Sequence, residues 1–213
     1  MRLVGGSPGA DVRRIAVVTA GLSDPSSTRL LADLLGDATK AALEEGGRAA
    51  EVEVIELRPL AHAITDALLT GFPTGDVAAA VEVVASADAV IAVTPVFSAS
   101  YSGLFKTFFD ILEPETLDGM PVMIAATAGS ARHSLVLDHA LRPLFGYLRA
   151  VVVPTGVFAA SEDWGSDRGA AGDLRHRVDR AAGQLADLVV ARPALHRPDP
   201  FGDVPDFASL LGS

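Results

Sequence analysis

The stretch of sequence that decides the fold is TPVFSASYSGLFKTFFD, at residues 94–110. It follows the apolar run AVIAV at 89–93, which is typical of a strand buried on both faces in a parallel sheet. Pro95 is expected to end the strand, and a loop of small residues then leads into apolar residues at helical spacing over 102–112. A buried strand followed by a loop and a helix is the repeating unit of α/β proteins.

The alternation of strand and helix extends to both sides of this stretch. Apolar runs predict strands at 14–20, 50–57, 89–93, 121–127 and 151–158, the last interrupted at Pro154. Helical spacing predicts helices at 26–46, 76–86, 102–112, 130–149 and 167–191. Residues 58–75 contain Pro59, Pro73 and two glycines, and we expect them to form a long connection.

Strands that alternate with helices predict a parallel sheet with right-handed crossovers and helices on both faces. With five strands, we expect a flavodoxin-like three-layer α/β/α sandwich with a five-stranded parallel sheet in the order 2-1-3-4-5. The length of 213 residues suits a single domain. We assign that domain to residues 1–192, with a loose leader at 1–12, and expect a proline-rich C-terminal tail at 193–213.

Composition argues against several classes of protein. The chain has no cysteine, which excludes disulfides, thiolate metal ligands and cysteine nucleophiles. The net charge of −10 argues against a nucleic-acid partner, which needs clustered Lys and Arg. No apolar run approaches the roughly 20 residues of a membrane span, and the leader lacks the apolar core of a signal peptide, so we expect a cytoplasmic protein. HExxH is absent, and no strand leads into a GxSxG nucleophile elbow, which disfavours a zinc enzyme and a hydrolase.

Ligands of such sheets bind at the carboxyl ends of the strands, near the point where the strand order reverses. The loops expected there, at 21–28, 94–102 and 127–132, are rich in Ser, Thr, Gly and Pro and poor in charge. The first loop has four hydroxyl residues at the start of a helix: Ser23, Ser26, Ser27 and Thr28. Ser26 is the expected cap of this helix. A helix cap needs only one hydroxyl, and the free N–H groups and dipole of the helix start favour a phosphate. The motif GxxxxGK[ST] is absent and no GxGxxG follows the first strand, which argues against a nucleoside-triphosphate enzyme and a typical dinucleotide fold.

The other two loops can hold the edges of a planar ring. The second loop offers backbone amides and the apolar wall of Phe97; its candidate residues are Pro95, Val96, Phe97, Ser98 and Ser100. The third loop can close the opposite edge, and Gly129 allows a close backbone approach; its candidates are Thr127, Ala128, Gly129 and Ser130. Each loop alone is an ordinary strand-to-helix turn, and only their joint placement indicates a ligand.

These segments resemble the NAD(P)H-dependent FMN reductase family of flavodoxin-like fold. They are most similar to the reductases that supply reduced flavin to alkanesulfonate-type two-component monooxygenases. The similar segments are PVFSASYSGLFKTFFDIL at 95–112, TAGSARHSLVLDHALRPLFGYLRA at 127–150 and PTGVFA at 154–159, within a resemblance from Arg14 to Ala160. The family often has Gly-Ser-x-Arg in its first loop, where this chain has Gly21-Leu22-Ser23-Asp24, and Arg29 is a candidate for the missing positive charge.

The resemblance implies FMN and NAD(P)H as cofactors. It places the FMN phosphate at Ser23 and residues 26–28, and the isoalloxazine ring against residues 95–98 and 127–130. Hydride transfer from a stacked nicotinamide needs orientation rather than a protein acid or base, so we expect no catalytic side chain. Arg132 is a candidate for holding nicotinamide phosphates or the flavin pyrimidine edge; a solvated side chain is the alternative.

The predicted helix at 130–149 has apolar residues on more than one face. A surface helix normally has one apolar stripe, so we expect the sheet to cover one face and a partner subunit the other, in a homodimer or homotetramer. Pro143 should kink or bulge this helix. The resemblance implies a π-type bulge there and a place for His139 at the subunit interface.

Three functions fit these patterns. The first is a reductase that releases reduced FMN to a flavin-dependent monooxygenase. The second is an enzyme that keeps FMN bound and reduces quinones, azo dyes or metal oxyanions, and the third is a flavodoxin-like electron carrier. The second apolar helix face and the long connection at 58–75 favour an enzyme over a carrier.

Overall fold

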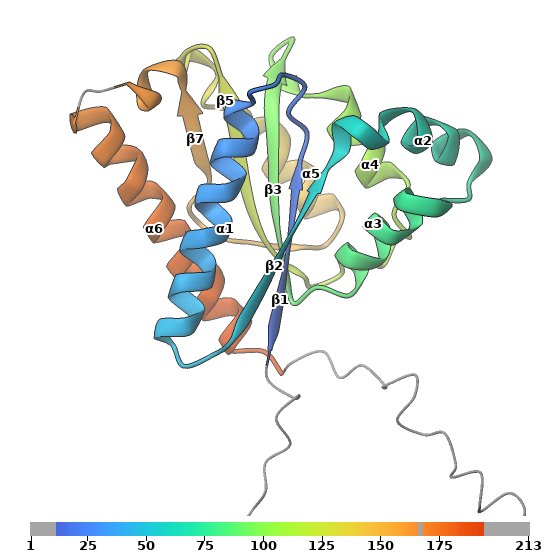
Figure 1. Ribbon diagram of the computed structural model, residues 1–213, viewed down its shortest axis with the longest axis horizontal. Coiled ribbons are helices and arrows are strands. Elements are labelled where there is room, and N and C mark those ends of the chain that lie inside the picture. The colour runs from blue at the N-terminus through green and yellow to red at the C-terminus, as the bar shows by residue number, and fades with distance from the viewer. Residues whose placement is uncertain (1–11, 166–167, 194–213) are drawn as a thin grey trace, which may run out of the picture.

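The apolar run at 89–93 forms the centre of the sheet. It begins strand β3 (Ala89–Phe97), whose first six residues are buried, as expected for a strand covered on both faces. Figure 1 shows β3 in the middle of a twisted sheet with helices on both sides. This computed structural model describes residues 12–165 and 168–193, so the predicted leader and tail lie almost entirely outside the described residues.

In the described part of the chain, seven strands make up the sheet: β1 (Arg13–Thr19), β2 (Ala50–Glu56), β3, β4 (Ser100–Tyr101), β5 (Pro121–Ala128), β6 (Val151–Val152) and β7 (Val157–Ala160). The strands β2, β1, β3, β5 and β6 lie side by side in that order and are parallel. β7 also pairs with β5, and β4 pairs antiparallel with the end of β3. The expected flavodoxin-like α/β fold with a parallel sheet is confirmed.

The expected count of five strands and the order 2-1-3-4-5 are corrected: the described residues form seven strands, of which five follow the path β2-β1-β3-β5-β6, while β4 pairs with β3 and β7 with β5. One added strand is β4, which forms because the chain turns back along the end of β3. The other arises because the run at 151–158 is two strands. Pro154 has no N–H to donate to the ladder, so pairing with β5 stops after β6 and resumes at Val157.

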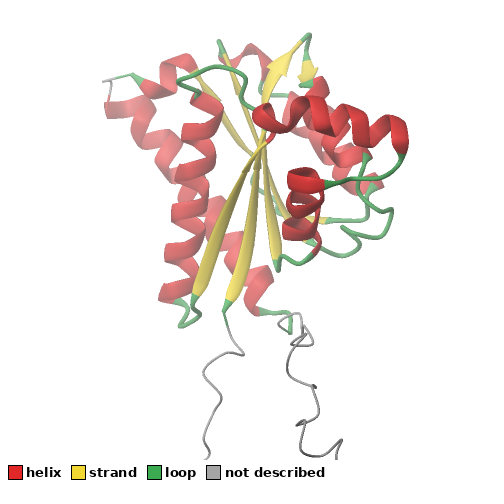
Figure 2. Ribbon diagram, turned by 45° about the vertical axis from the view of Figure 1, so that its right-hand side comes forward, coloured by secondary structure: helices red, strands yellow, loops and turns green. Residues whose placement is uncertain are grey.

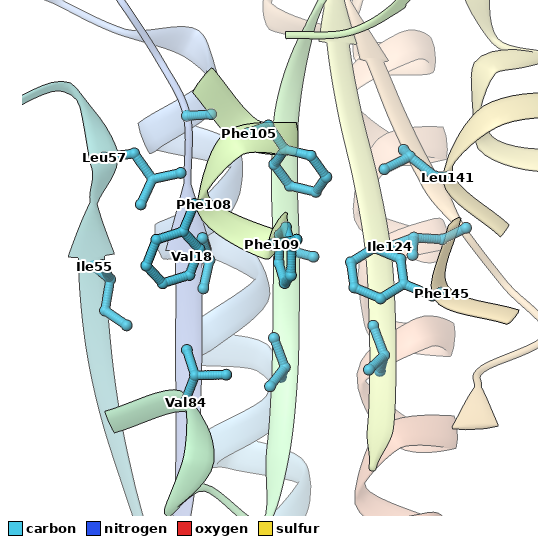
Figure 3. Close-up of a cluster of buried hydrophobic side chains, with 14 of the residues drawn as sticks. Val18, Ile55, Leu57, Val84, Phe105, Phe108, Phe109, Ile124, Leu141 and Phe145 are labelled. Carbon is cyan, nitrogen blue, oxygen red and sulfur yellow. The ribbon is translucent and has the colours of Figure 1, made fainter. Parts of the chain in front are cut away.

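Helices cover both faces of the sheet (Figures 1 and 2). One face carries α1 (Ser27–Glu45) and α6 (Arg168–Val190), and the other carries α2 (Leu57–Thr70), α3 (Gly75–Ala85), α4 (Gly103–Asp110), the π-helical segment η2 (Leu137–Leu141) and α5 (Arg142–Tyr147). Two short 3-10 helices follow β5 and β7, namely η1 (Ala131–His133) and η3 (Ser161–Trp164). Between the sheet and the helices α2 to α5 lies a buried apolar core. Figure 3 shows the rings that fill it, from Phe105, Phe108, Phe109 and Phe145.

The connection expected at 58–75 is instead largely the helix α2. Pro59 lies in its first turn, where a backbone N–H has no partner within the helix, so the proline does not break it. Ile64 and Ala67 are buried one turn apart, and Gly71 ends the helix in a left-handed conformation with φ 78°. The argument that a long connection at 58–75 favours an enzyme over an electron carrier therefore no longer holds.

The single helix predicted at 130–149 is divided among η1, η2 and α5. In η2 the backbone N–H of Arg142 donates to the carbonyl of Leu137, five residues back, as in a π-helix. The next residue, Pro143, has no N–H with which to make an α-helical bond to His139. The bulge expected near Pro143 is thereby confirmed.

Candidate functional site

The three predicted loops meet at one edge of the sheet. β1, β3 and β5 are adjacent and parallel, so their carboxyl ends lie side by side, at the top of Figure 1. We name the segments that follow them loop one (21–28), loop two (94–102) and loop three (127–132). The structure thus brings the predicted binding residues to the same edge of the sheet.

Loop one is built around the start of α1. Ser26 is the N-cap residue, and its hydroxyl oxygen accepts the backbone N–H of Arg29 at 3.2 Å. Its own hydroxyl proton stays available to a ligand. Ser23 and Ser27 are exposed on either side of the cap. Together with the N–H groups of the first helical turn, these hydroxyls can offer donors to a phosphate.

Gly21 belongs to this site, although the sequence pattern did not single it out. A Cβ at this position would lie 2.1 Å from Ser26 Oγ and 3.2 Å from the Cβ of Thr28. Any side chain here would therefore displace the cap of α1. The available signal was a glycine directly after a buried strand, where the chain must pass close to another backbone.

Arg29 does not supply a free positive charge to loop one. Its Nε donates to Asp33 Oδ1 at 2.8 Å, and its Nη1 donates to Glu56 Oε1. The hydrogen bond to Asp33 and the negative charges of Asp33 and Glu56 raise the pKa of Arg29, so the guanidinium is charged and paired. A phosphate in loop one would depend on hydroxyls, backbone N–H groups and the helix dipole rather than on Arg29.

Two predicted binding residues, Thr28 of loop one and Thr127 of loop three, bond to each other. Their hydroxyl oxygens are 2.8 Å apart, and each residue is only 3% exposed. The two hydroxyls therefore satisfy each other below the open edge of the site. Thr28 and Thr127 can still contact a ligand through their backbone groups.

Loop two is the tip of a β-hairpin. β3 continues through Pro95 to Phe97, so the expectation that Pro95 ends the strand is wrong. Pairing with β1 stops before Pro95, so its missing N–H breaks no ladder bond on that side. Phe97 pairs with Ser100, and the residues between them, Ser98 and Ala99, have φ 47° and 66°. Positive φ at both central positions is the pattern of a type I′ hairpin turn.

The base of loop two is fixed and its tip is open. The backbone N–H of Ser102 donates to Thr94 Oγ1 at 3.0 Å, and Ser102 Oγ accepts the N–H of Phe105 at 3.2 Å, which caps α4. Thr94 and Ser102 are buried, whereas Phe97 is 47% exposed. The Phe97 ring is thus accessible at this edge, and its predicted role as an apolar wall for a ring stays a prediction.

Loop three leaves space beside its backbone. Ala128 and Ser130 are half-buried and Gly129 is exposed. A Cβ on Gly129 would meet no atom within 4 Å, so no protein contact requires glycine there, and a ligand has room to approach. Arg132 follows in η1, and its side chain is exposed.

The groups that the three loops expose are suited to binding a ligand. Among residues 12–165 and 168–193, no group of three or more His, Asp or Glu could hold a metal ion. Over the same residues no single helix is long and apolar enough to cross a membrane. The pair α2 and α3, with a bend of 83° between them, reaches the length and apolar composition of a membrane span, by those two criteria only. Hydroxyls, amides and an apolar wall suit a phosphorylated planar ligand whose own ring performs the reaction.

The fold defines a flavodoxin-like α/β protein, and the three loops form a candidate ligand site at the switch point of its sheet. The family described as NADPH-dependent FMN reductase matches residues 13–165. The chain belongs to this family.

Relatives match over most of their length. The FMN reductase (NADPH) of Pseudomonas aeruginosa is 34% identical over 184 residues, which covers 85% of this chain and 95% of that protein. The NADH-dependent FMN reductase SfnE of Pseudomonas putida is 35% identical over 185 residues, with coverage of 86% and 96%. Among solved structures, an oxidoreductase from Corynebacterium diphtheriae is 51% identical with a TM-score of 0.82, covering 86% of this chain and all of that one.

Family membership identifies the protein as an enzyme. It is an oxidoreductase, an NAD(P)H-dependent FMN reductase, and FMN and NAD(P)H are its cofactors. This confirms the family and activity expected from the sequence and favours them over an electron carrier.

Proposed function

We propose that this reductase releases reduced FMN to a partner flavin-dependent monooxygenase. The observation that carries the proposal is the open edge of the site, where Ser23, Ser27, Phe97 and Gly129 are all exposed. A cofactor kept through many turnovers is usually enclosed by its pocket, whereas a flavin substrate must enter and leave. Reduction of a quinone, azo dye or metal oxyanion by retained FMN is the alternative.

FMN is placed with its phosphate at loop one and its ring between loops two and three. The proposed contact residues are Ser23, Ser26, Ser27, Thr28, Pro95, Val96, Phe97, Ser98, Ser100, Thr127, Ala128, Gly129, Ser130 and Arg132. When bound, FMN supplies the ring that accepts a hydride. The chain's own residues hold the phosphate, line the ring and, at Arg132, hold the nicotinamide phosphates or the flavin pyrimidine edge. No side chain is required to transfer a proton.

The activity test measures oxidation of NADH and NADPH by dialysed protein, with and without added FMN. Oxidation that rises and saturates with FMN is expected, because flavin is treated as a substrate. A protein that stays yellow after dialysis and oxidises the nicotinamide only when a quinone or dye is added would replace this proposal with the alternative.

Ser27→Asp tests the phosphate position. Ser27 is the first residue of α1 and is exposed. An Asp there places a like charge beside the phosphate, so FMN affinity should fall at least about tenfold, or about 1.4 kcal/mol. An acidic residue in the first turn also stabilises a helix, so the melting temperature should not fall.

The control for this test is Ser27→Ala, which removes one hydroxyl without adding charge and should weaken FMN far less. Both affinities are measured by titration of FMN fluorescence. Equal FMN affinity in Ser27→Asp and the unchanged protein would remove the phosphate from loop one.

The subunits are proposed to associate through the 131–151 region. Leu135 is 63% exposed and Tyr147 is 85% exposed, and His139 is exposed in η2 between them. Several exposed side chains with apolar surface on one segment are typical of a surface that a partner covers. A homodimer or homotetramer with His139 at the interface is therefore kept as a proposal, as is the cytoplasmic location expected from the sequence.

A further inference from the structure

The hydroxyl pair Thr28–Thr127 joins two parts of the chain that are 99 positions apart. Thr28 lies in the first turn of α1, and Thr127 lies at the end of β5. A buried hydroxyl that loses its partner destabilises a protein, so the two groups favour one arrangement of their segments. We call this pair the hydroxyl latch.

We propose that the hydroxyl latch fixes the spacing between loop one and loop three and thereby makes the enzyme prefer FMN to riboflavin. The inference rests on the proposed placement of FMN. A ligand with a phosphate at one end and a ring at the other gains from both loops only when they are held at the matching distance. Riboflavin has no phosphate and uses only the ring-binding loops, so the latch adds nothing to its affinity.

Contacts on both sides connect the latch to the binding loops. In loop one, the backbone at Gly21 runs so close to Thr28 that a Cβ there would lie 3.2 Å from the Thr28 Cβ, and Ser26 caps the same helical turn. In loop three, Thr127 lies in the sheet opposite Pro95 of β3. A movement of Thr28 would therefore shift the phosphate donors, while Thr127 stays with the ring-binding edge.

Thr39 shows what a merely structural threonine looks like in the same helix. It is fully buried in α1, and its hydroxyl donates to the carbonyl of Leu35 at 2.8 Å, within the helix. Such a bond joins no separate segments. Thr39→Val is therefore a matched control for removal of the latch.

The decisive variant is the double substitution Thr28→Val with Thr127→Val. Valine has nearly the shape of threonine, and removing both hydroxyls together leaves no unsatisfied partner, so stability should change little. The dissociation constants of FMN and riboflavin are measured by flavin fluorescence for the unchanged protein, the double variant and Thr39→Val. The preference for FMN should fall about three- to tenfold in the double variant, the size of one net hydrogen bond.

In the double variant, FMN should bind more weakly while riboflavin affinity stays unchanged. Thr39→Val should keep the full preference for FMN. A double variant that also keeps the full preference overturns the role of the latch, while the placement of the phosphate stands. An unchanged protein that binds FMN and riboflavin equally overturns both the phosphate placement and the latch.

A second comparison applies if the double variant does not fold. Thr28→Ser retains the hydroxyl and should retain the preference for FMN, whereas Thr28→Val should lose it. The same FMN-to-riboflavin ratio in these two single variants overturns the proposal.

Discussion

Gly21 lies where the chain leaves β1 and passes the start of α1, and the absence of a side chain there decides the shape of loop one. Gly21→Ala would place a Cβ 2.1 Å from Ser26 Oγ, so Ser26 would have to move. We expect FMN affinity to fall at least about tenfold and the protein to lose about 1 kcal/mol of stability with the cap. Fluorescence titration and urea denaturation measure the two effects.

Gly183→Ala in α6 is the matched control, because a Cβ there would meet no atom within 4 Å. It should leave FMN affinity unchanged and stabilise the protein by roughly 0.5–1 kcal/mol, since alanine favours a helix. If Gly21→Ala keeps FMN affinity and gains stability as Gly183→Ala does, the close approach of Gly21 to the cap is contradicted.

The hydroxyl residues of the site include contacts that the local sequence predicts and one contact that it does not. Ser26 was predicted as the cap of α1, and the structure confirms it, because a cap depends on residues within four positions. Thr28 and Thr127 were each expected at the ligand site, but their mutual hydrogen bond was not foreseen. That bond depends on how α1 packs on β5, which no local pattern encodes.

The hairpin of β3 and β4 has alanine where glycine is usual. Ala99 has φ 66°, a conformation that costs a non-glycine residue about 1–2 kcal/mol. Ala99→Gly should raise the free energy of unfolding by up to about 1 kcal/mol, because the relief exceeds the greater backbone entropy of glycine in the unfolded chain. Urea denaturation measures this change.

Ala63→Gly provides the opposite case, since Ala63 is exposed within the helix α2. The same substitution there should lower the free energy of unfolding by about 1 kcal/mol. Loss of stability in both variants would contradict the left-handed conformation of Ala99.

Elements were predicted well where the local pattern was unambiguous. The strand at 89–93 and the helix after Ser102 follow from a continuous apolar run and from helical spacing. α2 was missed because Pro59 was taken as the mark of a connection, although proline fits the first turn of a helix. The end of β3 was predicted too early because Pro95 was expected to stop the strand. Proline is tolerated there because pairing with β1 has already ended, and that is visible only in the assembled sheet.

The whole molecule is expected to be an oligomer. Light scattering should give a mass of two or four subunits for the unchanged protein, and Leu135→Asp with Tyr147→Asp should reduce it, because two charges would be buried without partners in the proposed interface. Val190→Asp is the control, because Val190 is 39% exposed at the end of α6, on the other face of the sheet. A monomeric mass for the unchanged protein would contradict the expectation.

By itself, the sequence determined the alternation of strands and helices, because apolar runs and caps are local properties of the chain. The flavodoxin-like class was inferred from that alternation, and the family from the resemblance of segments such as residues 95–112. Only the tertiary structure decided which charges and hydroxyls meet. It pairs Arg29 with Glu56 and so leaves loop one without a free guanidinium, and it joins Thr28 to Thr127. The physical reason is that hydrogen bonds and ion pairs act over a few ångströms between side chains, and residues far apart in sequence come that close only when the sheet and its helices pack.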